Sequence, residues 1–147
     1  MKKILLIFNF FLLSITILNA QNYFTAFKNG EKSFANQDYT NAIIEFTNVL
    51  ESKNDHDRAL NYRGLSYEYT NDLDKAVLDF KQAITFKSKE AEYYLNLGRV
   101  YFKLNKFTEA EAELVKAIDY DKKLEEAYEY RTLALIALKK YTEAVSN

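Results

Sequence analysis

The sequence predicts an all-α fold, a solenoid of antiparallel helix pairs stacked side by side, and three observations predict it. The 147 residues contain no proline and three glycines, so the usual signals for hairpins and long loops are scarce. Alanines recur every 34 residues, at Ala42, Ala76, Ala110 and Ala144. Around them the apolar residues fall at three- and four-residue steps, as in 41–50, which is the pattern of an amphipathic helix. A period of this length indicates a helical repeat array.

Other positions keep the same 34-residue step. Gly30, Gly64 and Gly98 lie twelve residues before an alanine, and Thr132 takes this place in the fourth copy. Large residues also stand three positions before each alanine, at Tyr39, Leu73, Phe107 and Tyr141, and four positions after it, at Phe46, Phe80 and Leu114. Seven positions after it come Val49, Ala83 and Ala117. Glycine inside a helix costs up to about 1 kcal/mol relative to alanine. We therefore expect each glycine to let a bulky residue of the second helix approach.

The repeat divides the chain into two-helix units. We expect first helices at 23–36, 57–70 and 91–104, paired with second helices at 39–52, 73–86 and 107–120. The units are then 23–56, 57–90, 91–124 and an incomplete fourth at 125–147, whose second helix has only begun at 141–147. Polar segments such as 36–38 and 70–72 suit the turns.

The C-terminal end of this array is expected to be open. Tyr128, Leu135 and Leu138 belong to a first helix whose companion is short. Solenoids need a polar cap, so an uncovered apolar strip predicts either further chain or self-association through the C-terminal end.

Residues 1–20 differ from the rest of the chain. Lys2 and Lys3 precede an apolar run from Ile4 to Leu18, and Ala20 follows, which is the layout of a signal peptide. The run is shorter than the roughly 20 apolar residues that a transmembrane helix needs, so an uncleaved anchor is the weaker alternative. We expect export, to the periplasm or outside the cell, of a repeat domain at 21–147 that does not insert into the membrane.

Charge and composition exclude several classes of function. Loss of Lys2 and Lys3 would change the formal net charge from −1 to −3, and no long run of one sign occurs, which argues against nucleic acid as a partner. There is no cysteine, so disulfides and thiol chemistry are excluded. Glu109, Glu111 and Glu113 alternate along one helix and point to different faces. We therefore expect no catalytic residues, no cofactor and no metal, and a protein that is not an enzyme.

The single histidine, His56, lies between Asp55 and Asp57 in the link after the first unit. An acid-histidine cluster can bind a metal or act as a general base. One loop cannot supply a closed ligand set, so we expect a solvated link in which Asp55 or Asp57 caps the next helix.

These columns resemble the tetratricopeptide repeat (TPR). The third unit is the nearest match, with Tyr94, Leu97, Gly98, Tyr101, Phe107, Ala110, Leu114 and Ala117 at the positions of the pattern. The proline that usually closes a repeat is replaced by Asn54, Ser88 and Lys122. The resemblance implies a right-handed superhelix of about three full repeats and a partial fourth, with first helices that line a concave groove for a peptide or partner helix.

Counting along the first helices in that geometry gives the candidate partner-binding residues of the groove. They are Phe27, Glu31, Phe34, Asn61, Leu65, Tyr69, Leu95, Arg99, Phe102 and Lys103, with Glu68, Glu129 and Leu133 as further inward positions. Chaperone-binding members of the family grip a C-terminal carboxylate with Lys, Asn and Arg, but Glu31 and Glu92 stand at two of those positions. The resemblance predicts a non-catalytic protein-binding module that does not take an acidic chaperone tail. The alternative is a structural or self-associating segment, or the N-terminal part of a longer repeat protein.

Overall fold

The computed structural model describes the backbone of residues 22–146 and the side chains of residues 22–139. The signal peptide expected at 1–20 therefore lies outside the described residues. Between residues 22 and 146 no helix combines the length and apolar character needed to cross a bilayer.

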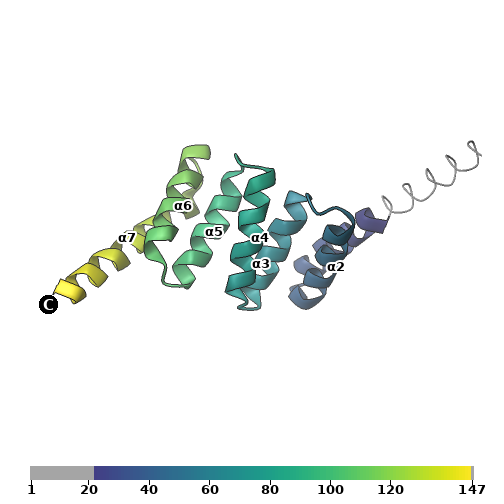
Figure 1. Ribbon diagram of the computed structural model, residues 1–147, viewed down its shortest axis with the longest axis horizontal. Coiled ribbons are helices and arrows are strands. Elements are labelled where there is room, and N and C mark those ends of the chain that lie inside the picture. The colour runs from purple at the N-terminus through teal and green to yellow at the C-terminus, as the bar shows by residue number, and fades with distance from the viewer. Residues whose placement is uncertain (1–21, 147) are drawn as a thin grey trace, which may run out of the picture.

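The described chain is a single row of helices (Figure 1). A helix at 22–35 is followed by α2 (Tyr39–Ser52), α3 (Asp57–Tyr69), α4 (Leu73–Phe86), α5 (Ala91–Lys103), α6 (Phe107–Tyr120) and α7 (Glu125–Ser146). Each helix packs mainly on the ones before and after it in the chain, and no strand occurs between residues 22 and 146. The all-α solenoid of helix pairs is confirmed, and the first six helices have the bounds that the repeat predicts to within one residue.

The glycine column holds each helix pair together. A Cβ added to Gly30 would lie 2.8 Å from the ring of Phe46, and one added to Gly64 would lie 2.8 Å from Phe80. At Gly98 the Cβ would lie 2.7 Å from Cγ of Leu114. All three large partners are fully buried. The expected role of the glycines, to admit a bulky residue of the second helix, is confirmed.

The turns inside the pairs use one conformation. Gln37, Asn71 and Asn105, which are 34 residues apart, have φ values of 61°, 63° and 58°, in the left-handed region. After Asn71, the N–H of Asp72 donates to the carbonyl of Tyr67, which closes the Schellman motif that ends α3. Asparagine tolerates this conformation better than most residues, so two of the three turns carry a local signal.

The fourth unit differs from the expectation. No turn precedes Tyr141, and α7 continues as one helix from Glu125 to Ser146; in Figure 1 it extends past α6. Lys139 occupies the place that Gln37, Asn71 and Asn105 have in the other units. It lacks the short polar side chain that favours a left-handed conformation, and adopting that conformation would cost it roughly 1–2 kcal/mol. Thr132, in place of a glycine, also removes the room in which a second helix would pack back. The predicted start of a second helix at 141 is therefore wrong.

Candidate functional site

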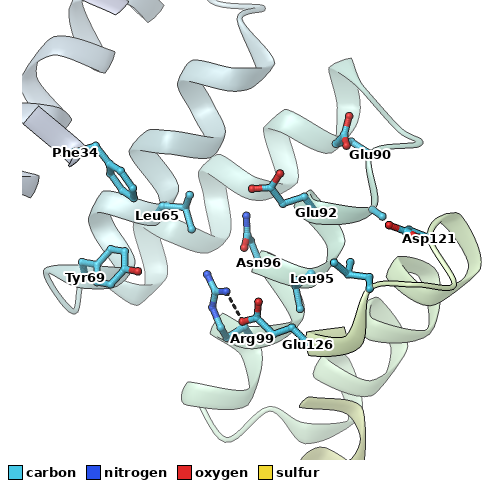
Figure 2. Close-up of a pocket in the computed structure, with 12 residues that line it drawn as sticks. Phe34, Leu65, Tyr69, Glu90, Glu92, Leu95, Asn96, Arg99, Asp121 and Glu126 are labelled. Atoms are coloured by element: carbon cyan, nitrogen blue, oxygen red, sulfur yellow. Dashed lines mark hydrogen bonds and ion pairs between the residues drawn. The ribbon is translucent and has the colours of Figure 1, made fainter. Parts of the chain in front are cut away.

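An open pocket of about 490 Å³ lies on the face that the first helices share. Residues from the helix at 22–35, α3, α5 and α7 surround it (Figure 2). Its lining consists of Phe34, Leu65, Tyr69, Glu90, Ala91, Glu92, Leu95, Asn96, Arg99, Asp121, Leu124 and Glu126. A second pocket of about 260 Å³ adjoins it and shares Glu90 and Glu92. We call the two together the groove.

Five of the ten candidate residues meet in the first pocket: Phe34, Leu65, Tyr69, Leu95 and Arg99. Figure 2 shows Phe34, Leu65 and Tyr69 grouped on one side and Glu90 and Asp121 on the far side, with Arg99 held to Glu126 between them. The structure thus brings these residues to one place. Their part in binding stays a prediction.

Two aromatic candidates lie elsewhere. Phe27 is 7% exposed and packs against Phe46 and His56, with ring centroids 5.7 Å and 4.7 Å away, so it belongs to the core. Phe102 is half-buried between Phe107 and Tyr130, at 5.5 Å and 5.8 Å. Both rings pack between helices. Counting positions along one helix does not show that their side chains point there.

The polar candidates are held in place by neighbouring repeats. Asn61 is buried and lines the second pocket, where its Oδ1 accepts a 2.9 Å hydrogen bond from Nδ2 of Asn96. Glu31 lies outside both pockets and forms a 2.8 Å ion pair with Arg58. Glu129 and Leu133 are exposed on α7 and line neither pocket.

A network of charges lies beside the pocket at Arg99. Its guanidinium donates from Nε and Nη2 to the carboxylate of Glu68, at 2.9 Å and 2.8 Å, and from Nη1 to Glu126, at 2.9 Å. Lys103 adds a 2.8 Å ion pair to Glu68, so this candidate is also tied to the network. The network links α3, α5 and α7 across the face that carries the pocket.

The network favours the charged forms of Glu68 and Arg99. Burial disfavours the carboxylate of Glu68, but the hydrogen bonds and charges of Arg99 and Lys103 outweigh this effect and keep the pKa of Glu68 below its usual value. Burial likewise works against the guanidinium of Arg99, but Glu68 and Glu126 hold the pKa of Arg99 above its usual value. A ligand in the pocket would therefore meet the charges of Arg99 and Glu126 already paired with each other.

Two of the ion pairs between first helices share one spacing in the sequence. Glu31 pairs with Arg58 and Arg99 pairs with Glu126, and in both cases the partners are 27 residues apart. This spacing is one repeat less seven residues, so a position late in one first helix meets an early position of the next. The apolar repeat columns do not reveal these pairs, but opposite charges 27 residues apart in the sequence indicate them.

We call the three pairs of positions 31–58, 65–92 and 99–126 the ladder. Its middle step has no ion pair. Leu65 and Glu92 occupy the corresponding positions, and the apolar side chain of Leu65 offers no cation. Glu92 is exposed in the first turn of α5 and lines both pockets. Among the described residues its carboxylate forms no ion pair or hydrogen bond.

An aromatic wall borders the pocket opposite Glu90. Tyr69 is 60% exposed, and its ring stacks on Tyr39 with centroids 4.4 Å apart and planes 6° apart. Phe34 and Tyr69 form a T-shaped pair with ring centroids 5.9 Å apart. Stacking fixes the exposed ring without covering it, so little side-chain entropy would be lost when a ligand packs on it.

His56 has a structural role that differs from the one expected. Its Nδ1 accepts a 3.2 Å hydrogen bond from the N–H of Ala59, so His56 itself caps α3, and its ring stacks on Phe27. Burial, followed by the charge of Lys53, lowers the pKa of His56, while Asp57 partly opposes this. Asp57 instead accepts a 2.7 Å hydrogen bond from the hydroxyl of Tyr93. The prediction that an aspartate caps α3 is therefore wrong; within the described residues no three metal-binding side chains gather.

Comparison with known families matches the central part of the chain. Residues 91–124 match the model described as tetratricopeptide repeat, and residues 69–105 match one described as TPR repeat. A search of curated proteins finds no significant match.

Solved structures with the same fold are numerous. The Arabidopsis OM64 TPR domain has a TM-score of 0.77 at 16% identity, over 79% of this chain and 96% of that one. The first TPR of Spaghetti (RPAP3), bound to the HSP90 peptide SRMEEVD, has a TM-score of 0.78 at 20% identity, over 81% and 94%. The TPR2B domain of yeast Sti1 in its pHsp70 complex has a TM-score of 0.72 at 18% identity, over 82% and 98%. The described chain thus has the fold of a tetratricopeptide solenoid.

Proposed function

We propose, from the tetratricopeptide-repeat fold and the groove, that this protein is an exported, non-catalytic interaction module that binds a partner peptide or helix. The observation that carries the proposal is the open pocket of about 490 Å³, in which Tyr69 stays 60% exposed beside Leu65. An exposed, ordered aromatic ring in a concave site is a typical anchor for a bound segment.

The similar structures support this use of the face. The Spaghetti domain was solved bound to the HSP90 peptide SRMEEVD, and the Sti1 domain was solved in a pHsp70 complex. In this chain Glu31 and Glu92 stand where the chaperone-binding members are expected to use side chains that grip a carboxylate. We therefore propose that a partner segment lies in the groove, and that this segment is not an acidic chaperone tail.

Affinity capture tests the proposal. The purified protein is used as bait in an envelope extract, captured proteins are identified by mass spectrometry, and the capture is repeated with Tyr69→Ala. Phe86→Ala is the matched control, because Phe86 is 47% exposed on α4 and lies outside the groove. We expect Tyr69→Ala to reduce capture and Phe86→Ala to leave it unchanged, with equal helix content by circular dichroism. Equal capture by all three proteins would show that the groove is not the binding surface.

Export is the second part of the proposal. The basic residues Lys2 and Lys3, followed by the apolar run that ends at Leu18, support it. Intact-mass measurement of the protein from the secreted or periplasmic fraction should give a chain that begins near Gln21. Recovery of the chain from Met1 in the membrane fraction would make residues 1–20 an anchor.

Self-association is the alternative function, and α7 favours it. Leu133, Leu135 and Ile136 are 45–48% exposed, and a pocket of about 540 Å³ lies between Phe107 and Leu138. Sedimentation over a range of concentrations separates the two functions. A monomer that still captures a partner supports the interaction module, whereas a concentration-dependent oligomer that Ile136→Asp disrupts supports self-association.

A further inference from the structure

The cations of the groove are already neutralised. Arg58 pairs with Glu31, and Lys87 pairs with Glu90. Arg99 donates from all three of its nitrogens to carboxylates, and its side chain is 15% exposed. An incoming carboxylate would have to displace a carboxylate that is already in place, so the groove has no ready site for an acidic group.

The free charge of the groove is negative. Glu92 has no ionic partner among the described residues and lines both pockets, so a ligand in either pocket meets its carboxylate. It lies in the first turn of α5, where the positive end of the helix dipole interacts favourably with an acidic side chain. Asp121 lines the far side and accepts a hydrogen bond from the backbone N–H of Lys123 through Oδ1, which leaves its other oxygen open.

Apolar surface lies directly beside these carboxylates. Leu65 stands at the ladder position opposite Glu92, where the neighbouring steps have a charged residue, and it lines the same pocket as Leu95 and Tyr69. The face of an exposed tyrosine also attracts a cation. A ligand that fits both features needs a positive group next to an apolar one.

We propose that the groove selects a basic peptide segment, in which a lysine or arginine pairs with Glu92 and a neighbouring apolar side chain packs on Leu65 and Tyr69. This inference rests on the proposed function and adds the chemical class of the partner. Charge complementarity inside a half-enclosed groove raises both the selectivity and the rate of association, and it weakens as salt is added.

A random peptide library displayed on phage tests the inference, because it offers basic, acidic and apolar segments to the groove in one selection. The full protein, Glu92→Gln and Glu45→Gln are each used for selection, and the enriched peptides are then titrated by fluorescence polarisation. Glu45 is the matched control, because it lies on α2, lines neither pocket and has no ionic partner among the described residues. Both substitutions keep the shape of the side chain and remove one negative charge.

We expect the wild type and Glu45→Gln to enrich peptides in which lysine or arginine stands beside an apolar residue. Glu92→Gln should bind those peptides about threefold to tenfold more weakly, and a version with glutamate in place of the basic residues should not bind. Enrichment of acidic peptides, or an unchanged affinity in Glu92→Gln, would overturn the inference.

Tyr69→Ala distinguishes a failure of the basic selectivity from a failure of peptide binding by the groove. If it weakens binding of neutral apolar peptides while Glu92→Gln has no effect, the groove binds peptides and only the basic selectivity is refuted. If no enriched peptide depends on Tyr69 or Glu92, both this inference and the peptide-binding role of the groove are refuted.

Discussion

Gly98→Ala adds one methyl group at the closest contact between two helices. The new Cβ would lie 2.7 Å from Cγ and 3.0 Å from Cδ2 of Leu114, and 3.3 Å from the carbonyl oxygen of Ala110. Leu114 is fully buried, and the nearest atom is the branch point of its side chain, so a simple rotation cannot clear the space. The methyl group must therefore push α5 and α6 apart.

Two effects of opposite sign decide the magnitude. Overpacking a buried site costs typically about 1–3 kcal/mol. Alanine is about 1 kcal/mol better than glycine in a helix interior, which offsets part of this cost. We expect Gly98→Ala to lower the free energy of unfolding by about 1 kcal/mol.

Thr132 supplies the matched control, because it occupies the column of Gly98 on α7 and its side chain is exposed. Comparing Thr132→Ala with Thr132→Gly measures the same glycine-to-alanine exchange without a packed partner. Urea unfolding followed by circular dichroism should show alanine as the more stable residue at 132, by up to about 1 kcal/mol, and as the less stable residue at 98. Stabilisation by alanine at both sites would refute the reasoning about the glycine column.

Three other substitutions test the packing, the charge network and the helix cap. Ala110→Leu should lower the free energy of unfolding by about 1–3 kcal/mol, whereas Ala112→Leu on the exposed side of the same helix should change it little, in the same urea assay. Glu68→Gln should cost about 3 kcal/mol, because it leaves Arg99 buried with one partner; and since the folded pKa of Glu68 is lowered, the wild type should lose this advantage as the pH falls through that pKa. The folded pKa of His56 is also lowered, so its cap is present above the unfolded value and is lost as the pH falls through the folded one. Melting curves over the acidic range should therefore show a smaller loss for His56→Asn, which caps without titrating, and equal losses would contradict the cap.

Most of the fold could be predicted from the chain, because the signals are local and repeat. The alanine and glycine columns follow from contact between two helices of one unit, which the 34-residue period copies through the chain. The ends of α3 and α5 carry Asn71 and Asn105, residues that suit a left-handed turn by themselves. Gln37 has the same conformation without that preference, so there the packing of the pair decides.

The groove depended on tertiary structure to a much greater degree. The resemblance to the tetratricopeptide repeat implied which helices form the inner face, and counting along them placed Leu65, Tyr69 and Arg99 there. Only the packed helices decided that Phe27 turns into the core and that Arg99 is tied to Glu68 and Glu126. They also left Glu92 without an ionic partner among the described residues. The physical reason is that a repeat fixes the position of each backbone segment, whereas the direction and charge state of a side chain depend on what the next repeat places against it. The continuous α7 has the same cause, since a turn at Lys139 would need the packing of a returning helix to offset its strain.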